Sequence, residues 1–458
     1  MCSRNVGKTL LGSVAAVGLT AVWSPAVAGS PAQNQVELRA QIETLNRRLE
    51  RLEQRRAATP GTRRVAPAAA VETGAKPRSW KLPGTNTSMQ IGGFAQLDLI
   101  YDINAVSGDG LSSNGASGAS FPSTGSATAN RQGNFRLSAK RSRIFIRTWT
   151  PTDWGALETK IEGDFQGAGG NQLISNSNSF RLRHAFGRLG PVLAGQTNST
   201  FRFGDFEPRV FEDRGPAAKG GPRQGIVSYT HSFGGGTSAV ISVENPETGR
   251  AVTATSVTVP VFISGGGAPD RVPDFALALK HKWSSGMAQI GALLGEHNVD
   301  DGAGNQGNDL LWGVQAALRL TFNQKRTTVG VLGYYGYGIG RAFRGQPAEV
   351  AVSGVGNALS VDSVRNFGGY AWIRHQWSDT IQTNLIYGRN DGDVESFIAK
   401  PLIPARTLDV HWSIHANIVY QPIKNVTFAI EYVMAKSQFH NARESTVQRV
   451  QFSSVYKF

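Results

Sequence analysis

Apolar and polar residues alternate along most of the chain from residue 89 to its end. Residues 412–420 and 426–434 each place apolar side chains at every second position. Side chains along a β-strand point alternately to its two faces, so each of these stretches presents one apolar face. A helix with the same spacing could not keep either face uniform. The pattern predicts an all-β protein.

The alternating stretches number about 16, a typical even count for transmembrane β-barrels. Short connections, such as 190–191, 284–286 and 323–325, take turns with long ones, notably 104–133, 202–223, 246–272 and 341–362. Outer-membrane barrels have short periplasmic turns and long outer loops, whereas a soluble sandwich has no reason to alternate in this way. We predict an antiparallel, 16-stranded transmembrane β-barrel over residues 81–458. Its strands should begin near residues 89, 134, 155, 178, 192, 224, 237, 273, 287, 309, 326, 363, 380, 407, 425 and 446.

The last predicted strand ends on Phe458, and Tyr456, Phe452 and Val450 share its face. A terminal Phe in this setting is similar to the C-terminal signature of outer-membrane barrels, although the last strand of a soluble sandwich would also fit. Aromatic residues recur near the predicted short turns. Membrane barrels have girdles of aromatic residues at both interfaces, so this recurrence favours the barrel. Aromatic residues near these turns are Trp149, Trp154, Trp283, Trp377 and Tyr420.

Residues 1–28 have the pattern of a secretory signal. Arg4 and Lys8 precede an apolar stretch over 10–22, and small residues over 26–28 suit cleavage. A membrane anchor is the alternative, but the stretch is shorter than the roughly 20 residues that a spanning helix needs. Cys2 is the only cysteine, so the exported chain would hold no disulfide.

Residues 29–56 predict a short periplasmic coiled coil, in which apolar residues recur at alternating spacings of four and three: Leu38, Ile42, Leu45, Leu49 and Leu52. An isolated helix of this length is marginal in water. It would need copies held close by an oligomer, and a lone amphipathic helix on another surface is the alternative. Residues 57–80 form an Ala/Pro/Arg-rich linker. The linker could contact anionic peptidoglycan or lipid phosphates, or be merely solvated.

Positive charge concentrates on one predicted strand. The chain has 47 Lys and Arg against 33 Asp and Glu, and residues 136–147 hold five cations and no acid. Arginines facing lipid would cost about 2–4 kcal/mol each, so Arg141, Arg143 and Arg147 should point into the lumen. In a regular strand, Phe135 and Leu137 would lie on the same face as these arginines. Apolar residues should face lipid and arginines the lumen, so we predict a bulge near Lys140.

Two further segments complete the predicted lumen. Arg181 and Arg183 form a second inward pair, with Phe180, Leu182 and Phe186 on the opposite face. The acids of 158–164 should pair with the strand before. Residues 202–214 should form a constriction that folds inward, in which acids neutralise some arginines and leave other cations for an anionic solute. Its charged residues are Arg202, Asp205, Glu207, Arg209, Glu212, Asp213 and Arg214. Arg188, Lys219 and Arg223 are weaker candidates. The alternative is that every arginine is neutralised and only stiffens the barrel.

Enzymatic chemistry has no support in the sequence. His281, His411 and His415 lie on predicted strands without a nucleophile motif beside them. We therefore predict no catalytic residue, no metal and no cofactor. Nucleic acid is also not an expected partner, because no known binding module accompanies the positive charge.

The chain resembles the DcaP-like porin family in its order of signal, coiled coil, linker and barrel. The resemblance rests on short motifs at residues 83–87, 150–155, 162–165, 181–185 and 195–197. It implies a homotrimeric 16-stranded channel in the Gram-negative outer membrane, among lipid and lipopolysaccharide. It also implies a preference for small anions such as dicarboxylates. Asn198 departs from the family, in which an aromatic residue is expected.

Two functions stay open at this point. The first is a passive porin for small anionic solutes, probably carboxylates, with an arginine-lined lumen. The alternative is a structural outer-membrane protein, a peptidoglycan tether or adhesin, with a closed barrel.

Overall fold

The computed structural model describes residues 31–57, 71–104, 124–127, 129–130, 132–171, 174–264, 267–345, 348–354, 359–440 and 443–458. The chain divides into two units, residues 1–70 and 71–458. The predicted signal and most of the predicted linker lie outside the described residues. In the described part, no helix is long and apolar enough to cross a membrane.

The first unit contains helix α1 (Pro31–Ala57). The five apolar residues of its predicted heptads are each between 50% and 63% exposed. A stripe of this kind is unfavourable on an isolated helix in water, so it needs a covering partner. The helix is as expected, and its assembly into a coiled coil stays a prediction.

The second unit is built from strands. They are β1 (Trp80–Lys81), β2 (Ser88–Asn104), β3 (Gln132–Ser138), β4 (Arg143–Thr152), β5 (Gly155–Asp164), β6 (Arg181–Leu189), β7 (Val192–Asn198), β8 (Arg223–Gly234), β9 (Thr237–Glu244), β10 (Ala251–Thr253), β11 (Asp274–Trp283), β12 (Gly286–Asp300), β13 (Gln306–Phe322), β14 (Thr327–Tyr337), β15 (Val350–Ser353), β16 (Ser360–Ser363), β17 (Arg365–Gln376), β18 (Ile381–Asp393), β19 (Leu408–Ile423), β20 (Val426–Phe439) and β21 (Glu444–Lys457). Short 3₁₀ turns η2 (Gly204–Phe206), η3 (Gly340–Ala342) and η4 (Lys400–Leu402) lie in the connections.

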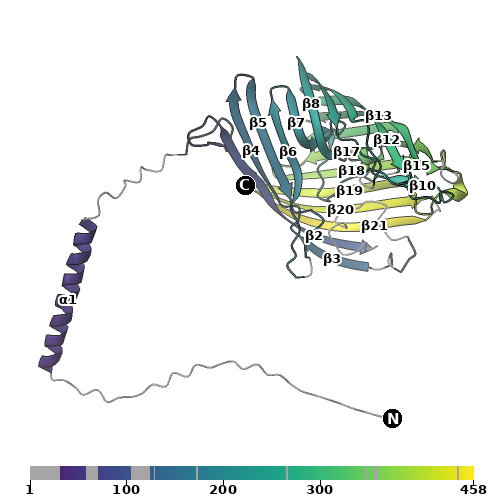
Figure 1. The fold of residues 1–458 in the computed structure, drawn as a ribbon. Helices are drawn as coiled ribbons and strands as arrows, with labels where there is room; N and C mark the ends of the chain where they lie inside the picture. The colour runs from purple at the N-terminus through teal and green to yellow at the C-terminus, as the bar shows by residue number, and fades with distance from the viewer. Residues whose placement is uncertain are drawn as a thin grey trace, which may run out of the picture. The chain divides into compact units, whose positions relative to one another are not determined.

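The wall of this unit is a closed antiparallel barrel (Figure 1). Each wall strand pairs with its neighbour in sequence, β9 pairs with β11, and β21 returns to pair with β2. The described strands form one 18-stranded sheet, of which β1 is a short addition to β2. Strands β3 and β4 share one wall position, because both pair with β2. The wall therefore has 16 strands, as predicted. Strands β10, β15 and β16 form a separate small sheet.

The break between β3 and β4 confirms the predicted bulge near Lys140. Phe135 and Leu137 before it are 59% and 49% exposed and point outward. Residues 139–142 leave the ladder, and the strand resumes at Arg143. Because of these extra residues, even-numbered side chains face inward before the break and odd-numbered ones after it. Arg136 and Arg143 therefore both face inward.

One predicted face is wrong. A second bulge between Glu162 and Gly163 shifts the register of β5 and β6. Phe186 therefore lies opposite buried Lys160, and its ring packs edge-on against His184 at 6.4 Å. Phe180 and Leu182 point outward as expected, at 52% and 44% exposed.

The barrel has its apolar side chains outside and its polar side chains inside. On β2, Leu97 and Tyr101 are exposed, whereas Asp98 and Asp102 are almost fully buried. Other wall strands likewise have exposed apolar and buried polar side chains. The aromatic residues Trp154, Trp377 and Tyr420 are exposed near short turns. An apolar exterior of this extent is stable only in a membrane.

A charge on this outer face should therefore destabilise the barrel. Leu385 of β18 is 54% exposed and lies near the middle of its strand. We expect Leu385→Arg to lower the free energy of unfolding in lipid vesicles by about 2–4 kcal/mol. Leu385→Ala is the matched control for lost apolar area, and equal effects of both substitutions would argue against a lipid-facing position.

Candidate functional site

The segment 199–222, between β7 and β8, folds into the barrel and packs on its inner wall. Phe201, Phe203 and Phe206 are each at most 2% exposed. They form a core with inward residues of β11, β12, β13, β14, β17 and β18, including Ala276, Ala278, Met287, Ala317, Leu332, Trp372 and Ile386. Burying an aromatic side chain of this size contributes about 1.5–3 kcal/mol. Part of the inner wall is therefore apolar because this segment covers it.

Hydrogen bonds from the wall fix the backbone of the segment. Trp372 Nε1 donates to the Phe206 carbonyl at 2.8 Å, and Arg319 donates to the Asp205 carbonyl at 2.6 Å. Farther along, Ser413 Oγ accepts from the Ala217 N–H at 2.9 Å. Since these hydrogen-bond partners come from three separate strands, β13, β17 and β19, the segment spans the barrel interior.

Glu431 of β20 clamps the middle of the segment. Its Oε2 accepts from the Phe211 N–H at 2.8 Å, and its Oε1 accepts from the Glu212 N–H at 3.0 Å. Asn417 also donates to Oε2 at 2.8 Å. The carboxylate is fully buried, and two of its acceptor positions are used on the segment's own backbone.

A second inward connection lies beside the first. Gly221 N–H donates to the Ala342 carbonyl at 2.8 Å, and Arg344 N–H donates to the Lys219 carbonyl at 2.7 Å. The Phe343 ring stacks on Tyr334 of β14 with centroids 3.5 Å apart. The residues after β14 and the segment 199–222 thus form one layer inside the barrel.

Between this layer and the wall strands β4 to β8 lies a cavity of about 470 Å³, which we call the cationic cavity. Nine cations and a single acid are among its lining residues, which are Arg141, Arg143, Gln166, Gly167, Ala168, Arg181, Arg183, Arg202, Asp213, Arg214, Lys219, Arg223 and Arg344. Cations come from both sides, from the strands and from the inward layer. The cavity is therefore strongly positive.

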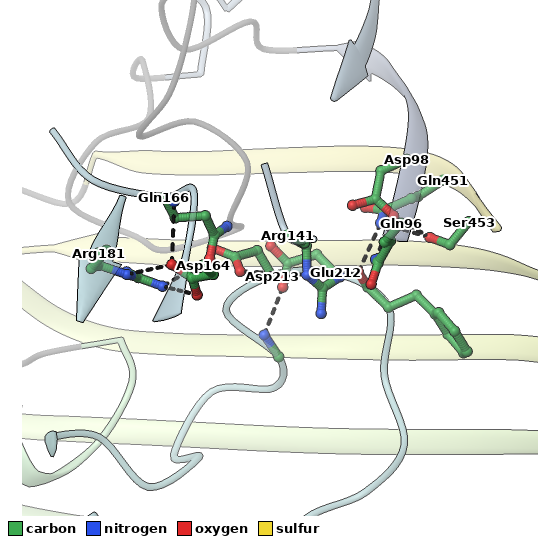
Figure 2. A network of polar contacts seen from close by, with 12 residues as sticks. Gln96, Asp98, Arg141, Asp164, Gln166, Arg181, Glu212, Asp213, Gln451 and Ser453 are labelled. Carbon is green, nitrogen blue, oxygen red and sulfur yellow. Dashed lines mark hydrogen bonds and ion pairs between the residues drawn. The ribbon is translucent and has the colours of Figure 1, made fainter. Parts of the chain in front are cut away.

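Some of these cations are held by buried acids of β5, and Figure 2 shows Arg181 against Asp164 and Gln166. Arg181 contacts both oxygens of Asp164 at 2.9 and 2.8 Å, and also donates to Gln166 Oε1 at 2.8 Å. Arg183 bridges Glu162 and Asp164 at 2.9 and 2.8 Å. Arg143 lies 3.3 Å from Glu162. The predicted pairing of β5 acids with β4 is present, and β6 arginines share the same two acids.

The inward segment has ion pairs of its own. Arg202 contacts Glu207 at 2.7 Å, and Lys219 lies 3.4 Å from the same carboxylate. Burial would raise the pKa of Glu207, but Lys219 and Arg202 hold that pKa below its usual range. Arg141 lies 3.7 Å from Asp213 and donates to the Phe211 carbonyl. These pairs orient the side chains and cancel part of the charge.

Three cations of the cavity are in no ion pair of this kind. Within the described residues, no carboxylate lies within ion-pair distance of Arg214, Arg223 or Arg344. They flank the cavity from the segment 199–222, from β8 and from the second inward connection. Asp213 and Glu207 still attract Arg344 at longer range, so these three cations are compensated less than the paired ones but not wholly uncompensated.

The structure brings together seven of the twelve predicted site residues. Arg141, Arg143, Arg181, Arg183, Arg202, Asp213 and Arg214 all line the cationic cavity. Arg147, Asp205, Glu207, Arg209 and Glu212 do not. Asp205 pairs instead with Lys280 at 2.9 Å, and buried Glu212 accepts from the Gly215 N–H at 2.7 Å. Whether the seven act on a solute stays a prediction.

Arg344 is a lining residue that the sequence analysis missed. It lies in a long connection whose inward course depends on backbone pairing with residues 218–221. Nothing in the local sequence distinguishes it from a connection exposed at the rim. Lys219 and Arg223, the weaker candidates, also line the cavity, whereas Arg188 does not.

Residues 80–455 match the family model described as "Porin subfamily". Among solved structures, the outer membrane channel DcaP of Acinetobacter baumannii matches with a TM-score of 0.66 at 21% identity, over 82% of this chain and 99% of that one. OmpF of Salmonella typhi matches with a TM-score of 0.49 at 11% identity, over 81% and 98% of the two chains. OmpT of Vibrio cholerae matches with a TM-score of 0.47 at 8% identity, over 81% and 98%. A search of curated proteins finds no match.

Loss of the Glu431 clamp should loosen the inward segment. In Glu431→Gln, one carboxylate oxygen becomes an amide NH₂, so either the Phe211 or the Glu212 N–H loses its acceptor. Hydrogen bonds to charged groups contribute about 1.5–3 kcal/mol each. We expect larger open-channel current fluctuations in planar bilayers.

The matched control is Glu158→Gln, which makes the same charge change on β5, where no contact with the segment 199–222 is described. Quiet currents in Glu431→Gln, equal to those of the control, would contradict the clamp.

Proposed function

The chain belongs to the porin subfamily, and on that premise we propose that it conducts small anionic solutes, chiefly carboxylates and dicarboxylates. Family and fold together confirm the coarser sequence predictions. The protein is a Gram-negative outer-membrane β-barrel porin, a channel and not an enzyme. The identity of the solute is the new claim.

The excess of cations in the cationic cavity supports this claim more than any other observation. An anion entering a narrow lumen loses hydration, and fixed positive groups must offset that loss. Nine cations and one acid line the cavity. Low-dielectric walls focus such a field and raise the local concentration of counter-ions.

Carboxylates suit the chemistry of the lining. A guanidinium presents a planar fork of donors that matches a carboxylate, and eight of the nine cations are arginines. Arg223 on the wall and Arg344 on the inward layer lie on different elements around one cavity. Separate guanidinium groups of this kind can receive the two ends of a dicarboxylate.

We further propose that the protein is a homotrimer in lipid and lipopolysaccharide. The exposed stripe of α1 supports this, because three helices held close by packed barrels would cover it. The sequence resemblance also implies a trimer. Peptidoglycan is a candidate partner of the basic linker, and such tethering could coexist with transport. A closed barrel is not favoured, because the chain belongs to the porin subfamily.

Neutralising the unpaired cations should weaken anion preference without breaking ion pairs. We expect Arg223→Gln combined with Arg344→Gln to shift the reversal potential in a salt gradient towards zero, and the corresponding Glu substitutions to invert its sign. Each lost charge removes an attraction that is about 4 kcal/mol at 4 Å when the effective dielectric constant is near 20.

The control is Arg389→Gln, which removes a cation that is paired with Asp391 outside this cavity. A cation-preferring wild-type channel, or unchanged reversal potentials in the double variant, would show that the lumen charges are wrongly assigned.

The predicted coiled coil can be tested by cross-linking. In a Cys2→Ser background, we expect Leu45→Cys to form covalent dimers on mild oxidation, because stripe positions of neighbouring helices face each other within disulfide reach. Arg47→Cys, on the opposite face of α1, should not. Monomers alone in both variants, seen on non-reducing gels, would favour the lone amphipathic helix.

A further inference from the structure

We propose a second anion site inside the barrel, at the end where the short turns lie, which is the periplasmic end in this class. This inference rests on the proposed function and adds a binding station to it. A cavity of about 530 Å³, the exit cavity, lies between β17, β18, β19 and the segment 199–222. Its lining residues are Arg209, Gln376, Asp379, Thr380, Gln382, Val419, Gln421, Pro422, Ile423 and Lys424.

Arg209 supplies the central positive charge. Its backbone carbonyl accepts from Asn417 Nδ2 at 3.0 Å, which fixes the residue beside β19. Its guanidinium lies 5.6 Å from the centre of the Phe211 ring and makes one long hydrogen bond, to Thr427 Oγ1 at 3.4 Å. In the described part of the chain it has no carboxylate partner. Most of its donors are therefore available to a ligand.

Gln382 is the second observation that points to a ligand. Its side chain lines the exit cavity and is only 7% exposed, yet its Nε2 has no hydrogen-bond partner among the described residues. An unsatisfied buried donor costs about 1–3 kcal/mol. The terminal torsion of a glutamine is soft, so this amide can turn its N–H groups towards an acceptor in the cavity.

The other amides of the cavity are already engaged. Gln376 Nε2 donates to the Ser378 carbonyl at 2.6 Å, and Gln421 Nε2 donates to the Lys424 carbonyl at 3.0 Å. They shape the turns and leave Arg209, Gln382 and Lys424 as the donor set. A carboxylate accepts from just such a combination of guanidinium, amide and ammonium.

Two more cations lie near Arg209, because Arg374 interacts electrostatically with Arg209, and Arg319 with Arg374. Arg374 follows the same face of β17 as Gln376 and donates to Thr328 Oγ1 at 2.7 Å, while its Nε has no partner. Arg319 donates to the Asp205 carbonyl and is also attracted by the Asp205 carboxylate. Asp379 is the one acid in the lining, and it lies on an exposed turn. The balance of charge favours a small carboxylate over a cation.

Two stations suit passive conduction. A solute must bind well enough to enter the lumen and weakly enough to leave, and several moderate sites meet this requirement better than one strong site. The exit cavity would receive a carboxylate that leaves the cationic cavity, and it would also capture one that arrives from the periplasm.

The test is block of single-channel current by succinate added to one side at a time. Orientation is read with a membrane-impermeant thiol reagent on Lys325→Cys in a Cys2→Ser parent, since residue 325 lies in a short turn. We expect Arg209→Gln to raise the dissociation constant for block from the short-turn side about tenfold. Block from the opposite side should change little. Gln382→Leu should give a smaller loss in the same direction.

Arg188→Gln is the control, because it removes one exposed cation near the short turn 190–191 and outside the exit cavity. Wild-type gel mobility of the unheated variants would show that each barrel folds. An equal loss in Arg188→Gln, or unchanged block in Arg209→Gln with anion preference intact, would overturn the exit site alone. A wild-type channel without anion preference would overturn the proposed function as well.

Discussion

Closure of the backbone hydrogen-bond ladder is the constraint on which the rest of this structure depends. In hydrocarbon, an open sheet edge would leave N–H and C=O groups unpaired at several kcal/mol each. The pairing of β2 with β21 removes that edge, since residues 94–102 lie opposite residues 449–457. Closure also decides the chemistry of the two faces, because within the membrane the outside must be apolar and charges on the wall strands must turn inward.

The charge of the lumen comes from the inward side chains of the wall together with the segment that packs on them. Sixteen strands enclose more space than wall side chains can fill, so the segment 199–222 enters and covers much of the inner wall. It buries three phenylalanines on one side and turns charged residues towards β4 to β8 on the other. The same segment thus narrows the lumen and brings Arg202 and Arg214 opposite the arginines of the wall. Apolar anchoring and cationic lining are two faces of one element.

The local alternation of apolar and polar residues was enough to predict most of the strands. Features that depend on pairing between distant segments could not be predicted from the sequence. The predicted first residues of the strands agree with the observed ones within a few residues, because each strand has its own alternation of apolar and polar residues. The bulge near Lys140 was visible as a change of parity between Leu137 and Arg141. The bulge beside Glu162 was not visible, because the extra residue is Arg183 of β6, and both Arg183 and His184 suit a polar lumen; only the register with β5 shows that the alternation of β6 breaks there, so Phe186 was placed on the wrong face. Arg344 depends on two connections meeting, which neither connection encodes alone.

Paired and unpaired arginines have different parts in such a lumen. Arg181 and Arg183 are held by Asp164 and Glu162 in geometry that fixes each guanidinium, and a fixed group loses little freedom when an anion arrives. Arg214, Arg223 and Arg344 are in no described ion pair, although Asp213 and Glu207 attract Arg344 at longer range. If every cation were unpaired, mutual repulsion and tight binding would both oppose conduction. If every cation were paired, the lumen would not prefer anions. For the proposed conduction of anions, a mixture of the two would give attraction at a strength from which a solute can still depart.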